Sequence, residues 1–154
     1  MDIKEGITLH GEYIFTIRDG ATDRVKRTYR YKNLVPTVAK TMIANNLTAA
    51  SPTNTMLATH VVLGSSTTAP AASDTQLGTE TYRNTVASIT NAANIAYFTG
   101  FFTTTETSGT YRECGVVSNG TGTANTGILL SHVAINIVKS TSETLTLDWT
   151  LTLS

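Results

Sequence analysis

Few residues in this sequence are of types that could carry out acid–base, nucleophilic or metal chemistry. The histidines are His10, His60 and His132, and none has the spacing to another histidine, cysteine or carboxylate that a metal-binding motif needs. The single cysteine, Cys114, lies in "YRECGVV" and has the character of a small buried thiol. The sequence contains neither a GxSxG nucleophile elbow nor a phosphate-binding glycine–lysine loop. We therefore expect no catalytic residues, no metal site and no cofactor, and a protein that is not an enzyme.

Two acidic residues, Glu80 and Glu113, lie in otherwise charge-poor segments in the middle of the chain. Each has an arginine close by in sequence, Arg83 and Arg112 respectively. A pair of carboxylates could act in glycoside hydrolysis, but nothing in the sequence selects these two as such a pair. The alternative is an ion pair or network that fixes strand register. We expect Glu80, Arg83 and Glu113 to have this structural role.

Basic residues are concentrated near the N-terminus. Residues 1–40 contain 8 basic and 5 acidic residues, a net charge of +3, whereas residues 41–154 contain 3 and 6, a net charge of −3. The cluster in "RVKRTYRYK" consists of Arg24, Lys26, Arg27, Arg30 and Lys32. Basic residues interleaved with tyrosines are typical of nucleic-acid binding, but strand alternation puts Lys26 and Arg27 on opposite faces, so nucleic acid is not an expected partner. We interpret the five cations as a docking patch for an acidic protein surface.

The composition favours an all-β protein that associates with other proteins. With 154 residues, the chain has the length of one domain, and we take residues 1–154 as that domain. Threonine accounts for 31 residues and suits a pleated sheet surface. Charged residues make up only 14% of the chain, and a surface so poor in charge gives little protection against association. No apolar run reaches signal-peptide or membrane-helix length, so a membrane is not an expected partner.

Hydrophobic periodicity predicts most of the elements. Alternating apolar residues, the Asp19-Gly20 turn and "VKRTYRY" predict a β-hairpin over residues 7–31. Pro36 and an apolar spacing of three to four residues predict a helix over about 36–46. The remaining strands are expected within 59–153, which gives about eight in total, and "TYRNTVASIT" is predicted as one strand. The fold class is thus an all-β two-sheet sandwich, jelly-roll-like, with one short helix.

Two features leave alternatives open. The last strand, "ETLTLDWTLTLS", alternates without a break and is either central or an edge that seeks a partner chain. The stretch 64–79 is rich in small and polar residues, yet strand patterns continue on both sides of it. We interpret this stretch as an ordered crossover loop between sheets rather than a domain linker, with a contact role possible.

The middle of the chain resembles small structural proteins of tailed bacteriophages. The resemblance covers about residues 32–139 and rests on a series of short motifs: Asn33 to Val35, Leu63-Gly64, Asp74 to Leu77, Glu80, Arg83, and Glu113 to Gly115. Proteins of this kind are tail-fibre, baseplate-associated or head-surface proteins and are generally non-enzymatic. The sequence differs from long fibre proteins in having no collagen-like repeats and no coiled-coil heptads, which favours a compact surface subunit.

The resemblance implies a virion structural protein, made in the host cytoplasm. The expected function is that of a capsid decoration or cement subunit that binds the major capsid protein or other virion proteins. We expect it to act as a homo-oligomer, with a trimer at a symmetry axis as the preferred form. The alternative is a tail-fibre or baseplate-associated protein that recognises the host surface through the glycine- and asparagine-rich loop "SNGTGTANTG" and the 64–79 loop.

Overall fold

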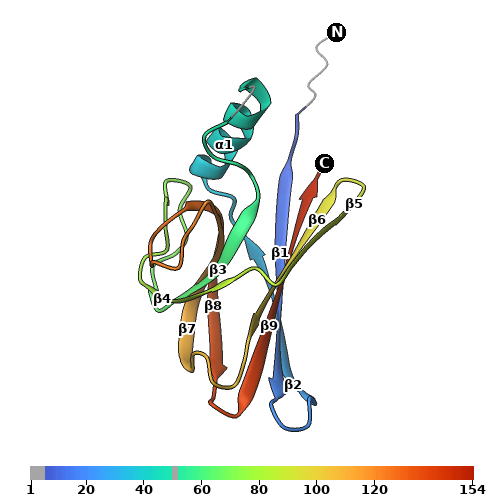
Figure 1. Ribbon diagram of the computed structural model, residues 1–154, viewed down its shortest axis with the longest axis vertical. Helices are drawn as coiled ribbons and strands as arrows, with labels where there is room; N and C mark the ends of the chain where they lie inside the picture. Colours follow the sequence, from blue (N-terminus) through green and yellow to red (C-terminus); the bar gives the residue numbers. More distant parts are fainter. Residues whose placement is uncertain (1–5, 50–51) are drawn as a thin grey trace.

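The protein folds into two antiparallel β-sheets packed against each other (Figure 1). The computed structural model describes residues 6–49 and 52–154. Its elements are β1 (Leu9–Asp19), β2 (Val25–Asn33), α1 (Thr37–Thr48), β3 (Ala58–Gly64), β4 (Glu80–Thr85), β5 (Ser88–Ala92), β6 (Ile95–Phe102), β7 (Gly109–Ser118), β8 (Ile128–Lys139) and β9 (Glu143–Leu153). The expected all-β sandwich with one short helix is confirmed for these residues.

The C-terminal strand lies inside its sheet. The five-stranded sheet A has the order β2-β1-β9-β6-β5, and the four-stranded sheet B has the order β4-β3-β7-β8. Strand β9 pairs along its length with β1 on one side and β6 on the other. Of the two placements that alternation allows for this strand, the structure has the central one.

The core lies between the inner faces of the two sheets. On β1, Tyr13, Phe15 and Ile17 are fully buried, as their period-two spacing predicts. Trp149 of β9 is 1% exposed and stacks on Phe98 of β6, with ring centroids 4.7 Å apart. Each such buried side chain contributes about 1.5–3 kcal/mol to folding. The Tyr13 hydroxyl also hydrogen-bonds with the Ser131 hydroxyl of β8, which links the two sheets.

One predicted strand divides into two, so the described residues form nine strands rather than about eight. The segment "TYRNTVASIT" contains β4, at the edge of sheet B, and β5, at the edge of sheet A. The change of sheet occurs within two residues. The N–H of Val86 donates to the Thr59 carbonyl of β3, and the N–H of Ala87 donates to the Thr99 carbonyl of β6. Periodicity could not reveal this division because both halves have strand patterns.

The loop of residues 65–79 does not cross between sheets, contrary to the sequence interpretation. It connects β3 to β4, which are neighbours in sheet B. The loop covers the outer face of that sheet. There Leu77 packs against Val62, Val117 and Leu129 in a second, small apolar cluster. Sheet B is therefore buried on both faces over this region.

Helix α1 lies at one end of the sandwich (Figure 1) and begins and ends slightly later than predicted. Pro36 is its N-cap, and Ala39 and Met42 are its buried residues. Before the helix, the backbone of Leu34 forms an isolated bridge with His132 of β8. Within the described residues, no helix is long and apolar enough to cross a membrane.

Candidate functional site

Three side chains that could carry acid–base chemistry meet on the outer face of sheet B. Nε2 of His132 lies 3.0 Å from Oε2 of Glu113, and Nδ1 lies 2.8 Å from Oδ2 of Asp74. Pairing of β7 with β8 places Gly115 opposite His132, so Glu113 is two residues along the same face of β7. Asp74 comes from the 65–79 loop. We call Asp74, Glu113 and His132 the loop latch.

Glu113 also holds the backbone of the loop. Its carboxylate accepts hydrogen bonds from the N–H groups of Ser66 (3.2 Å), Gly78 (2.9 Å) and Thr79 (2.7 Å). This approach needs space at Gly64, where a Cβ would stand 2.4 Å from the Glu113 carboxylate. One side chain therefore satisfies polar groups at both ends of the loop, and the small residues around it are what let it do so.

The latch is closed to substrates. Both ring nitrogens of His132 face carboxylates, and the side chains of His132 and Glu113 are 4% and 1% exposed. A catalytic histidine needs a nitrogen within reach of the reacting group, and a catalytic carboxylate needs a free oxygen. Each ring nitrogen of His132 thus has a carboxylate as its hydrogen-bond partner. Burial raises the pKa of Asp74, but the hydrogen bond from the Ala71 N–H and the contact with His132 outweigh it and lower that pKa. The arrangement binds a loop.

A second network holds the glycine- and asparagine-rich loop, residues 119–127. Arg83 and Glu80 of β4 form a bidentate pair with distances of 2.6 and 2.8 Å, and their side chains are 6% and 3% exposed. The guanidinium also donates to the carbonyl of Thr121 at 2.7 Å. Glu80 in turn accepts from the N–H of Asn125 at 2.9 Å. Glu80 and Arg83 are thus together, while Glu113 belongs to the separate loop latch.

Two of the five clustered cations bind an internal carboxylate. Lys26 and Arg27 both contact Glu143, at 2.7 and 2.9 Å, although strict alternation assigns them to opposite faces of β2. A β-bulge explains this, because the register advances by two residues on β2 between the partners of Ile17 and Arg18. Burial raises the pKa of Glu143, but the hydrogen bond from Lys26, that from the Ser140 N–H and the charge of Arg27 outweigh it and lower that pKa to about 2.

The other three cations of the cluster point to solvent. Arg30 lies 3.6 Å from Glu12, with both side chains largely exposed. Arg24 and Lys32 are exposed and form no ion pair within residues 6–49 and 52–154. Arg24, Arg30 and Lys32 are thus the members of the expected docking patch that are not bound to the buried carboxylate of Glu143.

The remaining chemistry-bearing residues lie apart. Cys114 is fully buried in the main core, and burial raises the pKa of its thiol. His60 is 8% exposed, and its Nδ1 has no hydrogen-bond partner within the described part of the chain. Burial and the charge of Arg83 lower the pKa of His60, which favours the neutral ring. His10 is exposed on β1.

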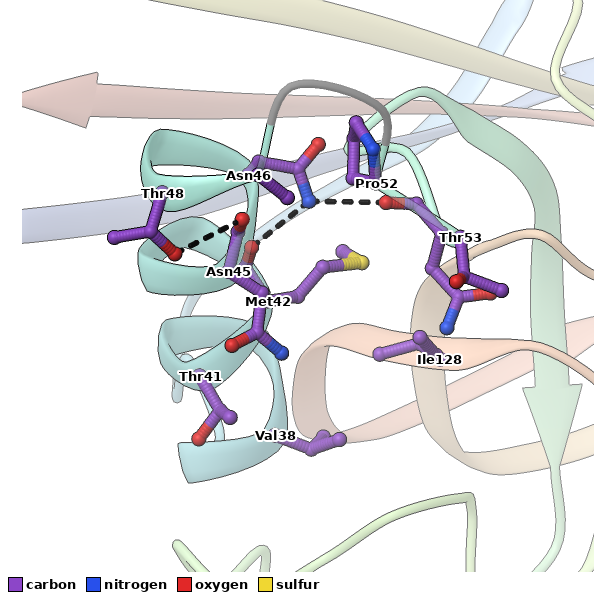
Figure 2. A pocket seen from close by; sticks show the side chains of 11 residues that line it. Val38, Thr41, Met42, Asn45, Asn46, Thr48, Pro52, Thr53 and Ile128 are labelled. Atoms are coloured by element: carbon purple, nitrogen blue, oxygen red, sulfur yellow. Dashed lines mark hydrogen bonds between the residues drawn. The ribbon is translucent and has the colours of Figure 1, made fainter.

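A polar pocket of about 460 Å³ lies beside the C-terminal half of α1 (Figure 2). Its lining combines apolar Val38, Met42 and Ile128 with uncharged polar groups such as Asn45 and Thr53. Figure 2 shows Asn46 spanning the pocket rim, where its amide donates to the carbonyl of Met42 at 2.9 Å and to that of Asn54 at 3.0 Å. Such a lining suits a small neutral polar molecule.

An apolar groove of about 500 Å³ lies between α1 and the inner face of sheet A, near β5. Its lining comes from α1, the segment before β3 and four strands of sheet A, and Asn46 is the polar residue in it. Side chains at its rim are unusually exposed for their type: Leu47 (79%), Leu57 (61%), Ile89 (41%) and Leu153 (39%). A concentration of exposed apolar side chains marks a contact surface.

Comparisons with protein-family models, curated proteins and solved structures found no match for this chain. The fold by itself places the chain in the class of all-β two-sheet sandwich proteins. Asp74, Leu77 and Glu113 attach the 65–79 loop to sheet B, and Leu34 pairs with His132 of the same sheet.

Sequence reasoning did not identify His132 and Asp74 as partners of Glu113. Glu113 and Asp74 precede His132 by 19 and 58 positions, and only strand pairing and loop placement bring the three residues together. A weak signal was present, since a glutamate and a histidine that each fall within a strongly apolar strand need polar partners.

Proposed function

We propose that this protein is a non-enzymatic structural subunit of a phage virion, most simply a capsid decoration subunit that binds the head surface as a homo-oligomer. The observation that carries this proposal is that the buried polar clusters are occupied by internal contacts. The loop latch, the Glu80–Arg83 pair and the Glu143 cluster each bind groups of the same chain. What the surface offers is contact chemistry: an exposed basic edge and an apolar groove.

The docking patch is proposed to be Arg24, Arg30 and Lys32. Arg30 and Lys32 lie on edge strand β2 and Arg24 directly precedes it, and all three residues are exposed, which suits an acidic protein surface. Lys26 and Arg27 support the patch by holding β2 to Glu143. A trimer at a symmetry axis stays a prediction from the resemblance, and binding would stabilise the shell by mass action.

Quantitative mass spectrometry of purified particles tests the location. We expect a copy number comparable with that of the major capsid protein; about a dozen copies would instead indicate the tail or baseplate. Charge reversal tests the patch: Arg24→Glu, Arg30→Glu and Lys32→Glu together should release the protein from particles at moderate salt. Lys40→Glu, at an exposed cation on α1, is the matched control and should leave occupancy unchanged. Unchanged occupancy in the triple variant would contradict the patch.

A tail or baseplate protein that recognises host glycans is the second candidate. The observation in its favour is the uncharged pocket beside α1, where amide and hydroxyl groups surround an apolar floor (Figure 2). Asn45→Ala and Thr41→Val should then abolish a glycan-array signal without lowering the melting temperature. Absence of any glycan signal for the unmodified protein would remove this candidate.

A further inference from the structure

The two edges of sheet A differ in how they are protected against pairing with another strand. Edge strand β2 carries the basic cluster, and charged side chains on an edge oppose edge-to-edge association. Edge strand β5 has the sequence "SITNA", which contains no charged residue and no proline, and all five residues are exposed. Its outward-facing backbone N–H and C=O groups are therefore open to a partner strand.

The unprotected edge is continuous with the apolar groove. Ile89 of β5 lies opposite Phe98 of β6, and both side chains line the groove. Leu57 and Leu47 project from the opposite rim. A partner that pairs with β5 thus also covers an apolar surface, and main-chain hydrogen bonds with an adjoining apolar pocket are what strand addition uses.

We propose that a second copy of this chain pairs with β5 across a two-fold axis, which joins the two A sheets and covers the apolar groove. The proposal rests on the self-association part of the proposed function and not on the docking patch. Two copies of an edge strand that form a closed dimer pair antiparallel across a two-fold axis, whereas parallel in-register pairing repeats the strand by translation and does not close. The product is a dimer, in place of the trimer expected from the resemblance.

The charge of this surface is compatible with a second copy of the chain as its occupant. In a two-fold interface the same surface patch forms both sides, so a patch with several like charges would repel its own copy. Within the described residues, neither β5 nor the lining of the groove contains a charged side chain. The same surface is therefore compatible with itself, whereas β2, with its lysines and arginines, is not.

Light scattering coupled to size-exclusion chromatography measures the proposed dimer without any particle. The unmodified protein should have twice the 16.4 kDa mass of the chain and dissociate on dilution. Ile89→Lys places a charge in the proposed interface in both copies, so we expect its dimer Kd to rise about a hundredfold or more. Leu57→Gln tests the groove rim by a second route and should also weaken the dimer. Val138→Lys, at an apolar side chain of β8 that is 52% exposed, is the matched control and should remain dimeric.

Hydrogen exchange identifies the surface. Amides of residues 88–92 should gain protection at concentrations where the dimer forms, and Ile89→Lys should remove this gain while its melting temperature stays near that of the unmodified protein at dilutions where both are monomeric. A monomer at every concentration, a trimer, or a dimer that survives Ile89→Lys would overturn the proposal. Particle occupancy of Ile89→Lys is measured separately, so loss of the dimer and loss of docking through β2 are distinguishable.

Discussion

Glu113 and His132 lie on neighbouring strands of sheet B with Oε2 and Nε2 3.0 Å apart, and together they hold a loop that approaches them from outside the sheet. Glu113 binds the backbone near both ends of that loop, and His132 binds Asp74 within it. The stretch 65–79, too polar for a strand, is ordered because this buried pair gives its polar groups partners.

Removing the Glu113 carboxylate should detach the loop. Glu113→Ala leaves His132 and three backbone N–H groups without their acceptor, and breaking a buried charged cluster costs about 3–5 kcal/mol. We expect the free energy of unfolding to fall by this amount in urea titrations, and the amides of Gly78 and Thr79 to lose hydrogen-exchange protection. Glu12→Ala removes the exposed partner of Arg30 and should cost less than about 1 kcal/mol. Equal effects of the two substitutions would contradict the latch.

Stability should fall in acid through Glu143. Its pKa is about 2 in the folded protein, against 4.5 as the ordinary value. Because the folded pKa is the lower one, the unfolded chain takes up the proton first, so the stabilisation is present above about pH 4.5 and is lost as the pH falls to about 2. Melting temperatures across this range should decline less steeply for Glu143→Gln than for the unmodified protein. Parallel declines would contradict the assignment.

Gly115 should not tolerate a side chain. A Cβ there would stand 2.7 Å from the carbonyl oxygen of Ser131 and 2.9 Å from a methyl of Leu129, so Gly115→Ala overpacks the face beneath Leu77. We expect a loss of about 1–3 kcal/mol in chemical denaturation. Gly122 has no neighbour within 4 Å of a Cβ, and Gly122→Ala should change stability by less than about 0.5 kcal/mol. A neutral Gly115→Ala would mean that the loop can move away at no cost.

Arg83 should not be replaceable by lysine. Its guanidinium binds both oxygens of Glu80 and the Thr121 carbonyl at once, which a single ammonium group cannot reproduce. We expect Arg83→Lys to cost about 1–3 kcal/mol and to increase proteolytic cleavage within residues 119–127. Arg30→Lys, at an exposed cation, provides the comparison and should leave both measurements unchanged. Cleavage that is the same in both variants would contradict the role given to Arg83.

The division of "TYRNTVASIT" into two strands and the bulge in β2 could not be predicted from the sequence. The alternation in "TYRNTVASIT" predicts a strand, and strands form there, but only the contacts of Val86 and Ala87 assign its halves to different sheets. Likewise, alternation separates Lys26 from Arg27, and only the bulge brings both to Glu143. In each case an irregularity of one or two residues in the strand pairing decides the outcome, and such irregularities have no periodic signal.

The sequence by itself determined what depends on local periodicity. Period-two alternation indicates that Tyr13, Phe15 and Ile17 face a core and that Leu145, Leu147 and Trp149 do the same, since neighbouring side chains on a strand point to opposite faces. Only the tertiary structure decided which strands adjoin, and so which distant polar groups meet: Glu113 with His132 and Asp74, Arg83 with residues 119–127, and β5 with the apolar groove. Those contacts depend on strand order and register, which arise from packing between segments far apart in the chain.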